Sequence, residues 1–134
     1  MKTIVLMLTL VASVALGADP PHVRAERLQW LRSGLPILER RSRQIAGTLS
    51  GGQQQLLAVA LALARRPSVL VLDEAFIGLD TDHRDAVIQM IEQEASGGAA
   101  VLVAEPTGEL ATLICSRGYE MDRGHIEGGF DPRS

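Results

Sequence analysis

The chain has 134 residues, a formal charge of −3 at pH 7, and 46% hydrophobic and 22% charged residues. This length and composition predict one modest globular domain, and the acidic balance argues against a nucleic-acid-binding protein. The single cysteine, Cys115, excludes an intramolecular disulfide and a cysteine metal cluster. We interpret Cys115 as a small buried helix residue, with a reactive thiol as the alternative.

Residues 1–18 have the three-part pattern of a secretory signal peptide. A basic start at Lys2 precedes an almost wholly apolar run over residues 4–16, and Asp19-Pro20-Pro21 then ends any helix. The apolar run is shorter than the roughly 20 residues that a membrane-spanning helix needs. The pattern predicts an export signal, with a buried strand or helix as the alternative.

Helices are predicted in the region before residue 48. Residues 22–33 have apolar residues at helical spacing, and residues 35–44 form a second helical piece whose arginine cluster is typical of a solvated face. The apolar positions of the first helix are Val23, Leu28, Trp30 and Leu31.

A loop over residues 48–52 leads into a helix that we expect from about Gly51 to Arg65, before Pro67. Apolar residues occur most of the way round this helix, so we expect it to be largely buried. Residues 69–72 then form a short apolar run that suits a central parallel strand. The apolar helix residues are Leu56, Leu57, Val59, Leu61 and Leu63.

The chain then continues with a further helix and strand. Asp80 or Thr81 is expected to cap a helix that reaches about Ala95 and ends at Ser96-Gly97-Gly98. Residues 99–104 read as another buried strand, and a short helix follows around residues 109–116. This alternation predicts an α/β layer with parallel strands.

The last part of the chain is predicted to be a β-hairpin. Tyr119–Met121 and His125–Ile126 are the expected strands, and Asp122-Arg123-Gly124 is the turn between them. Residues 128–134 read as a loose tail.

The segment Ser50-Gly51-Gly52-Gln53 combines a helix cap with an uncovered helix start. Ser50 and Gln53 have the spacing of a capping box. Two glycines in the first turn leave backbone N–H groups exposed at the positive end of the helix dipole, which is a site for anions such as a terminal phosphate. Helix capping alone is the alternative.

Two carboxylates, Asp73 and Glu74, follow the apolar run at the carboxyl end of the predicted strand. Ligands bind at this edge in open α/β sheets. Asp73 would hold Mg²⁺ through water, because hard cations prefer oxygen ligands. Glu74 would orient or deprotonate an attacking water. The alternative is a strand that simply ends in an acidic loop.

In this order and spacing, the motifs resemble the ATPase subunits of ABC transporters. Leu49–Gln55 is similar to the family's signature motif, residues 69–74 to its Walker B strand, and Gly78-Leu79-Asp80 to its D-loop. The resemblance covers roughly residues 35–127. Finer similarities point to importers of branched-chain amino acids or amides such as urea. They are Leu38-Glu39-Arg40-Arg41, Arg117-Gly118-Tyr119 and Gly124-His125-Ile126.

The resemblance implies an α/β fold, a partial P-loop NTPase (ABC ATPase) fold with a helical-subdomain remnant. Residues 1–18 would be the signal-like segment and residues 19–48 the remnant. Residues 49–127 would be the C-terminal half of the ATPase domain, and residues 128–134 the tail. An incomplete sheet would leave an exposed edge, from which we expect marginal stability or aggregation.

The resemblance also implies ATP and Mg²⁺ as cofactors and assigns roles to individual residues. Glu74 would be the catalytic base, and Asp73 would hold Mg²⁺ through water. The cofactor-binding residues would be Ser50, Gly51, Gly52, Gln53 and Asp80. Of these, Ser50, Gly51 and Gly52 would contact the γ-phosphate of ATP held by the opposite subunit, and Asp80 would lie at the dimer interface.

The implied partners are a second ATPase subunit, in a homo- or heterodimer, and an integral membrane permease, with no nucleic acid. The implied location is the cytoplasmic face of the inner membrane. The alternative is export to the periplasm, should residues 1–18 act as a signal peptide.

Three features depart from the family pattern. The phosphate-binding motif GxxxxGK[ST] is absent, and Lys2 is the only lysine. Pro106 stands where the family has a His or Gln that senses the γ-phosphate, and proline offers neither a side-chain donor nor a backbone N–H. Ala75 replaces the proline that usually follows the catalytic Glu. We therefore expect a truncated ATPase component with little or no turnover alone.

Two other functions are compatible with these motifs. The chain could be a non-catalytic interaction protein, or a gene-fusion remnant, that docks on a full ATPase subunit. It could also be a lobe of a chromosome-maintenance or repair ATPase, which shares the signature and Walker B arrangement. Such lobes are joined to long coiled coils, and the sequence has no heptad run.

Overall fold

The computed structural model describes residues 21–131. The predicted export signal, residues 1–18, therefore lies outside the described residues. The chain begins with helix α2 (Pro21–Gly34), followed by the short helix α3 (Pro36–Arg40) and a 3-10 turn at Ala46–Thr48. Helix α3 is shorter than the predicted piece over residues 35–44.

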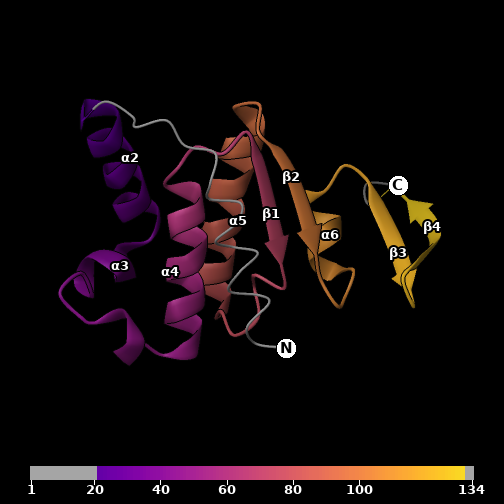
Figure 1. Ribbon diagram of the computed structural model, residues 1–134, viewed down its shortest axis with the longest axis horizontal. Helices are drawn as coiled ribbons and strands as arrows, with labels where there is room; N and C mark the ends of the chain where they lie inside the picture. Colours follow the sequence, from indigo (N-terminus) through magenta and orange to yellow (C-terminus); the bar gives the residue numbers. More distant parts are fainter. Residues whose placement is uncertain (1–20, 132–134) are drawn as a thin grey trace.

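The middle of the chain carries the α/β layer. Helix α4 (Gly51–Leu63) leads to strand β1 (Val69–Asp73), and helix α5 (Thr81–Ser96) leads to strand β2 (Ala100–Ala104). The two strands are parallel and paired in register from one end to the other. This arrangement confirms the predicted α/β fold with a partial parallel sheet, and Figure 1 shows the helices α4 and α5 beside the strand pair.

The C-terminal part consists of helix α6 (Glu109–Ile114) and a hairpin of strands β3 (Gly118–Asp122) and β4 (His125–Phe130). The strands are antiparallel, and the turn residues Arg123 and Gly124 both have positive φ, as a tight hairpin turn requires. Because β4 extends to Phe130, residues 128–130 belong to the hairpin, and the prediction of a loose tail from residue 128 was wrong for them.

The core lies between α4, α5 and strand β1. Leu70 and Leu72 of β1 are fully buried, and α5 contributes Val87, Met90 and Ile91. Helix α4 is largely buried, as predicted; its exposed residues are Gly51, Gln54 and Leu61. The buried residues of α4 are Leu56, Val59, Ala60, Ala62 and Leu63.

Strand β2 is less buried than its apolar sequence predicts. Its residues alternate between exposed and half-buried, and Leu102 is 62% exposed. The reason is topological: in the part of the chain that the structure describes, the parallel sheet has two strands, so β2 forms an edge. The prediction of a second buried strand was wrong. That of an exposed sheet edge is confirmed, and the expected marginal stability remains a prediction.

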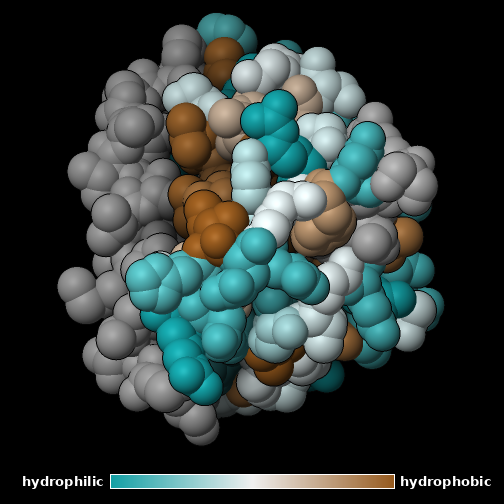
Figure 2. All heavy atoms as spheres, turned by 90° about the vertical axis from the view of Figure 1, so that its right-hand side faces the viewer, coloured by the Kyte–Doolittle hydropathy of each residue, from teal (hydrophilic) through white to brown (hydrophobic). Residues whose placement is uncertain are grey.

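The hairpin end of the molecule exposes further apolar side chains. Tyr119, Met121 and Ile126 each have more than half of their surface exposed. Figure 2, which views this end, shows hydrophobic side chains gathered among polar ones. Between residues 21 and 131, none of the helices is long and apolar enough to cross a membrane.

A buried arginine joins α2 to the ends of two other helices. The Arg27 guanidinium donates to the Leu63 carbonyl at the end of α4, from Nε at 2.9 Å and from one terminal nitrogen at 2.5 Å. It also forms an ion pair with Glu94 near the end of α5 at 2.5 Å and lies over the ring of Trp30. Burial lowers the pKa of Arg27, and Glu94 opposes this effect. No pattern in the sequence indicated this contact, which we call the Arg27 clamp.

Candidate functional site

The predicted capping box at the start of α4 is present. The Ser50 hydroxyl accepts from the backbone N–H of Gln53 at 3.3 Å, and the Gln53 side-chain oxygen accepts from the backbone N–H of Ser50 at 3.2 Å. These bonds satisfy two of the groups that a helix start leaves unpaired. Ser50 is exposed, so the cap holds the first turn of α4 at the molecular surface.

The two glycines of this turn have different surroundings. A Cβ on Gly51 would meet no atom of the described residues within 4 Å, which leaves room for a ligand on that side of the first turn. A Cβ on Gly52 would clash with the carbonyl oxygen of Gly78. Gly78 itself has φ 79°, a backbone conformation that favours glycine. Gly52 therefore allows the start of α4 to pack on the turn that follows β1.

The contrast between these glycines gives a test of the packing. Gly52→Ala is expected to cost about 1–3 kcal/mol, because backbone must move to accommodate the methyl group. Gly51→Ala has free space and is expected to stabilise the helix by up to about 1 kcal/mol. Urea unfolding of both variants measures the difference. Equal midpoints for the two variants would show that Gly52 does not pack closely on Gly78.

The carboxylates Asp73 and Glu74 lie where β1 ends. Asp73 is half-buried and Glu74 is exposed. The Glu74 backbone N–H donates to the Ala104 carbonyl at the end of β2, at 2.8 Å. Glu74 has φ 49°, a conformation that costs a residue other than glycine about 1–3 kcal/mol and that concentrates at functional sites.

Asp80 caps helix α5, as predicted. One carboxylate oxygen accepts from the His83 backbone N–H at 2.9 Å, and the other lies 2.7 Å from His83 Nδ1. The His83 backbone bond, followed by the side-chain bond, holds the pKa of Asp80 below its usual value. The carboxylate remains exposed on its outer side, so capping leaves it accessible to a partner.

Two residues that were not among the predicted site residues also contact the turn after β1. The Gln55 side-chain amide donates to the Ala75 carbonyl at 3.1 Å. The Glu105 carboxylate accepts from the backbone N–H of Phe76. Neither contact has a local sequence signal, because each joins segments that are far apart in the chain.

Glu105 shares the environment of the other two carboxylates. Burial raises the pKa of Glu105; the Phe76 bond opposes this, and the charges of Glu74 and Asp73 add to it. The next residue, Pro106, is exposed. The structure thus places a carboxyl group, rather than a His or Gln side chain, directly after β2.

The donor set fits one half of a nucleotide–magnesium site. Within residues 21–131 no three acidic, histidine or cysteine side chains form a metal site on their own. Mg²⁺ in phosphate-transfer sites usually takes one or two carboxylates and completes its shell with phosphate oxygens and water, which Asp73 and Glu74 can accommodate. The open start of α4 suits a phosphate group. The lysine-containing phosphate loop is absent from the sequence.

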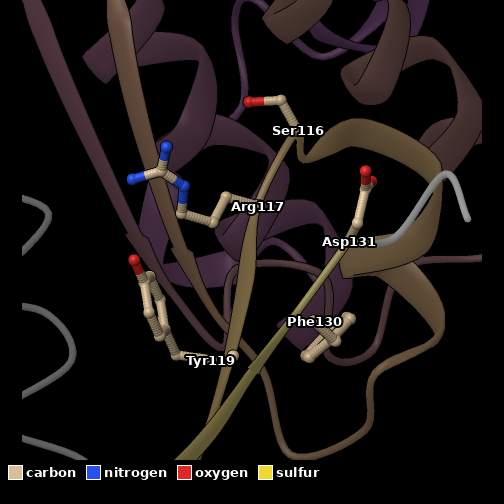
Figure 3. Close-up of a pocket in the computed structure, with 6 residues that line it drawn as sticks. Ser116, Arg117, Tyr119, Phe130 and Asp131 are labelled. Carbon is tan, nitrogen blue, oxygen red and sulfur yellow. The ribbon is translucent and has the colours of Figure 1, made fainter.

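A separate hollow of about 380 Å³ lies at the hairpin. Figure 3 shows the side chains of Arg117 and Tyr119 pointing to one side, and those of Phe130 and Asp131 lying at the end of β4. None of the predicted site residues lines this hollow. Nearby, Cys115 is half-buried rather than fully buried and follows α6, and burial raises the pKa of its thiol. Neither the hollow nor Cys115 provides the carboxylates that are predicted to hold Mg²⁺ and to act on water.

Comparison with known families and curated proteins gives consistent matches. A sequence model of the ABC transporter family matches residues 5–77. The high-affinity branched-chain amino acid transport ATP-binding protein BraG of Pseudomonas aeruginosa is 33% identical over 124 residues, covering 89% of this chain and 52% of BraG. The Fe(3+) ions import ATP-binding protein FbpC of Pseudomonas fluorescens is 36% identical over 105 residues, covering 76% of this chain and 30% of FbpC.

Solved structures share the fold. The ATP-binding subunit of an ABC transporter superposes with a TM-score of 0.79 at 22% identity, covering 95% of this chain and 52% of that chain. The dimeric structure of the ABC transporter cassette MJ0796 gives a TM-score of 0.74 at 24% identity, covering 97% and 55%. The chain spans about half the length of BraG and under a third of FbpC.

Proposed function

The chain belongs to the ABC transporter family, and we propose that it forms the signature and Walker B half of an ATP-hydrolysing component of an importer. The observation that carries this proposal is the packing of the open, Ser50-capped start of α4 against the Gly78 turn that follows Asp73 and Glu74. This packing combines a phosphate-binding helix end and two carboxylates in one structural unit.

In the proposed site, Ser50, Gly51 and Gly52 contact the γ-phosphate of an ATP molecule held by a second subunit, and Gln53 keeps the cap in place. The exposed Ser50 and the free space at Gly51 support this role. Asp80 faces the same second subunit from the start of α5. The proposed partners are therefore another ATPase subunit and an integral membrane permease.

In this proposal, Asp73 and Glu74 act on the nucleotide that belongs to this subunit, not on the ATP held by the second subunit. ATP and Mg²⁺ supply the phosphoryl group and the charge that stabilises its transfer. Asp73 would hold the metal through water, and Glu74 would orient the attacking water and accept its proton. A phosphate-binding loop outside these 134 residues completes this site. We propose that residues 19–48 are the helical-subdomain remnant and that residues 49–127 are the C-terminal half of the ATPase domain.

The transported substrate is proposed to be a branched-chain amino acid or an amide. The similarity to BraG, together with residues 38–41 and 117–119, supports this class. The proposed location is the cytoplasmic face of the inner membrane. The family match begins at residue 5 and runs through the apolar segment, so the alternative of an export signal has no support from these comparisons.

A complementation experiment tests the contact with the second subunit. A full-length ABC ATPase whose own signature motif has been disabled would be mixed with this chain. The chain is expected to restore ATP hydrolysis, and Gly51→Asp is expected to reduce the restored rate about a hundredfold, because a carboxylate at the helix start repels phosphate. Helix stability should not fall, since the position is open and an acidic residue suits a helix start.

Gly47→Asp is the matched control. A Cβ on Gly47 would likewise meet no atom of residues 21–131 within 4 Å, but Gly47 lies in the 3-10 turn before the cap. This variant should stimulate hydrolysis as the parent chain does. If the chain binds the disabled subunit without restoring hydrolysis, it is a non-catalytic interaction protein, an alternative that Pro106 favours.

A further inference from the structure

The turn after β1 is held at three consecutive residues by groups from other parts of the chain. Glu74 donates its backbone N–H to the Ala104 carbonyl at 2.8 Å. The Ala75 carbonyl accepts from the side chain of Gln55 at 3.1 Å. Phe76 donates its backbone N–H to the carboxylate of Glu105. We call residues 74–76 the carboxylate turn.

This turn requires external support because its first residue has an unfavourable backbone conformation. Glu74 has φ 49°, and its side-chain direction depends on the backbone staying in that region. Two of the three supports come from the end of β2, where Ala104 and Glu105 are adjacent. The end of β2 therefore holds the backbone from which the Glu74 side chain extends.

The burial of the Glu105 carboxylate costs free energy. Its Oε1 atom is buried and has no hydrogen-bond partner among residues 21–131, which is unfavourable for a carboxylate. The neighbouring charges of Glu74 and Asp73 add to this cost. An apolar residue of the same volume would avoid both effects, but it would leave the buried Phe76 without an acceptor for its N–H.

We propose that Glu105 is a positioning residue for Glu74, which holds the carboxylate turn by accepting the N–H of Phe76. The role in hydrolysis rests on the proposed function, because it requires Glu74 to act on water. The role in holding the turn is independent of ATP and can be measured on the chain alone.

Amide hydrogen exchange of the chain tests the positioning role. Glu105→Met keeps the volume but removes the acceptor, and the Phe76 amide is expected to exchange about tenfold faster, the factor for loss of one hydrogen bond. The Glu74 amide should also exchange faster, while Val87 in α5 stays unchanged. The midpoint of urea unfolding should change little, because the removal of a buried unpaired oxygen offsets the loss of the Phe76 hydrogen bond.

Glu105→Gln is the conservative variant, since its side-chain oxygen can still accept from Phe76. Its Phe76 amide should exchange as in the parent chain, and this variant decides the matter if Glu105→Met does not fold. Glu92→Met, on the exposed side of α5, should leave the Phe76 amide unaffected. Parent-like exchange at Phe76 in Glu105→Met, or equally fast exchange at every core amide, would overturn the proposal. Fast exchange in Glu105→Gln would do the same.

A second measurement separates positioning from the proposed ATPase activity. In a chimera that joins the first half of BraG to this chain from residue 5, Glu105→Met is expected to lower kcat about tenfold with KM for ATP unchanged. Glu105→Gln should restore most of kcat. An inactive parent chimera would count against the proposed function, whereas the exchange data would still decide whether Glu105 holds the turn.

Discussion

Glu74→Gln is expected to reduce ATP hydrolysis about a thousandfold, in the range that general acid–base catalysis contributes. The amide has the shape of the carboxylate but cannot accept a proton from the attacking water. The backbone at residue 74 is the same for both side chains, so the bond to the Ala104 carbonyl should persist. The chimera of BraG and this chain is the appropriate protein for this measurement.

Single-turnover hydrolysis and equilibrium ATP binding separate chemistry from affinity. The rate should fall in Glu74→Gln, while ATP affinity should stay within about twofold of the parent, because the carboxylate acts on water rather than on the nucleotide. Glu92→Gln makes the same chemical change on the exposed surface of α5 and should leave the rate unaltered. A Glu74→Gln chimera that hydrolyses ATP at more than half the parent rate would remove Glu74 from the catalytic role.

The sequence alone predicted the features of the structure that depend on residues close together in the chain. The Ser50 cap and the Asp80 cap use side chains three positions from the N–H groups that they bind, so the starts of α4 and α5 were predicted to within a residue. Strand β1 was also predicted, because its apolar run ends abruptly at Asp73. These elements position the predicted site residues.

The sequence alone did not predict burial and contacts that depend on segments far apart in the chain. The apolar residues of β2 suggested a buried strand, but burial depends on how many strands pair beside it, and β2 lies at an edge of the described sheet. The contacts of Gln55 and Glu105 with the carboxylate turn were missed for a related reason. Each is a single side chain that binds backbone 20 or more positions away, and such a contact leaves no periodic pattern.

The apolar start of the chain shows a further limit of pattern analysis. A basic residue, an apolar run and small residues satisfy the description of an export signal, yet the family match covers the chain from residue 5. A short apolar run is equally compatible with a buried segment of a globular domain. Composition could not separate these interpretations, whereas the family match over residues 5–77 gives the export signal no support.

Arg27→Met is expected to destabilise the chain by about 3–4 kcal/mol, the magnitude for removing one partner of a buried ion pair. The substitution leaves the Glu94 carboxylate, whose side chain is 12% exposed, without its cation. It also removes both hydrogen bonds to the Leu63 carbonyl at the end of α4. The cation that lies 3.8 Å from the Trp30 ring centroid is lost as well.

Arg32→Met is the matched control for this prediction. Arg32 lies on the same helix and forms an ion pair with Glu39 at 2.8 Å, but the two side chains are 59% and 54% exposed. Solvent-exposed pairs contribute about 0–1 kcal/mol, so this variant should unfold close to the parent. Urea unfolding of the two variants, followed by circular dichroism, measures the difference. Equal losses would mean that the Arg27 clamp contributes no more than a surface pair.

The double variant Arg27→Met/Glu94→Met determines how much of the loss comes from the stranded charge. Replacing a whole buried ion pair by apolar residues is often neutral or stabilising, so the double variant should recover most of the stability lost in Arg27→Met. Recovery should be incomplete, because the Leu63 carbonyl still lacks its donor.

The clamp binds the C-terminal end of α4, and the candidate phosphate site is at the N-terminal end of the same helix. The double variant therefore also tests whether the link between α2 and α4 affects the site: if it does not, Gly51→Asp should have the same effect on complementation in the double variant as in the parent chain.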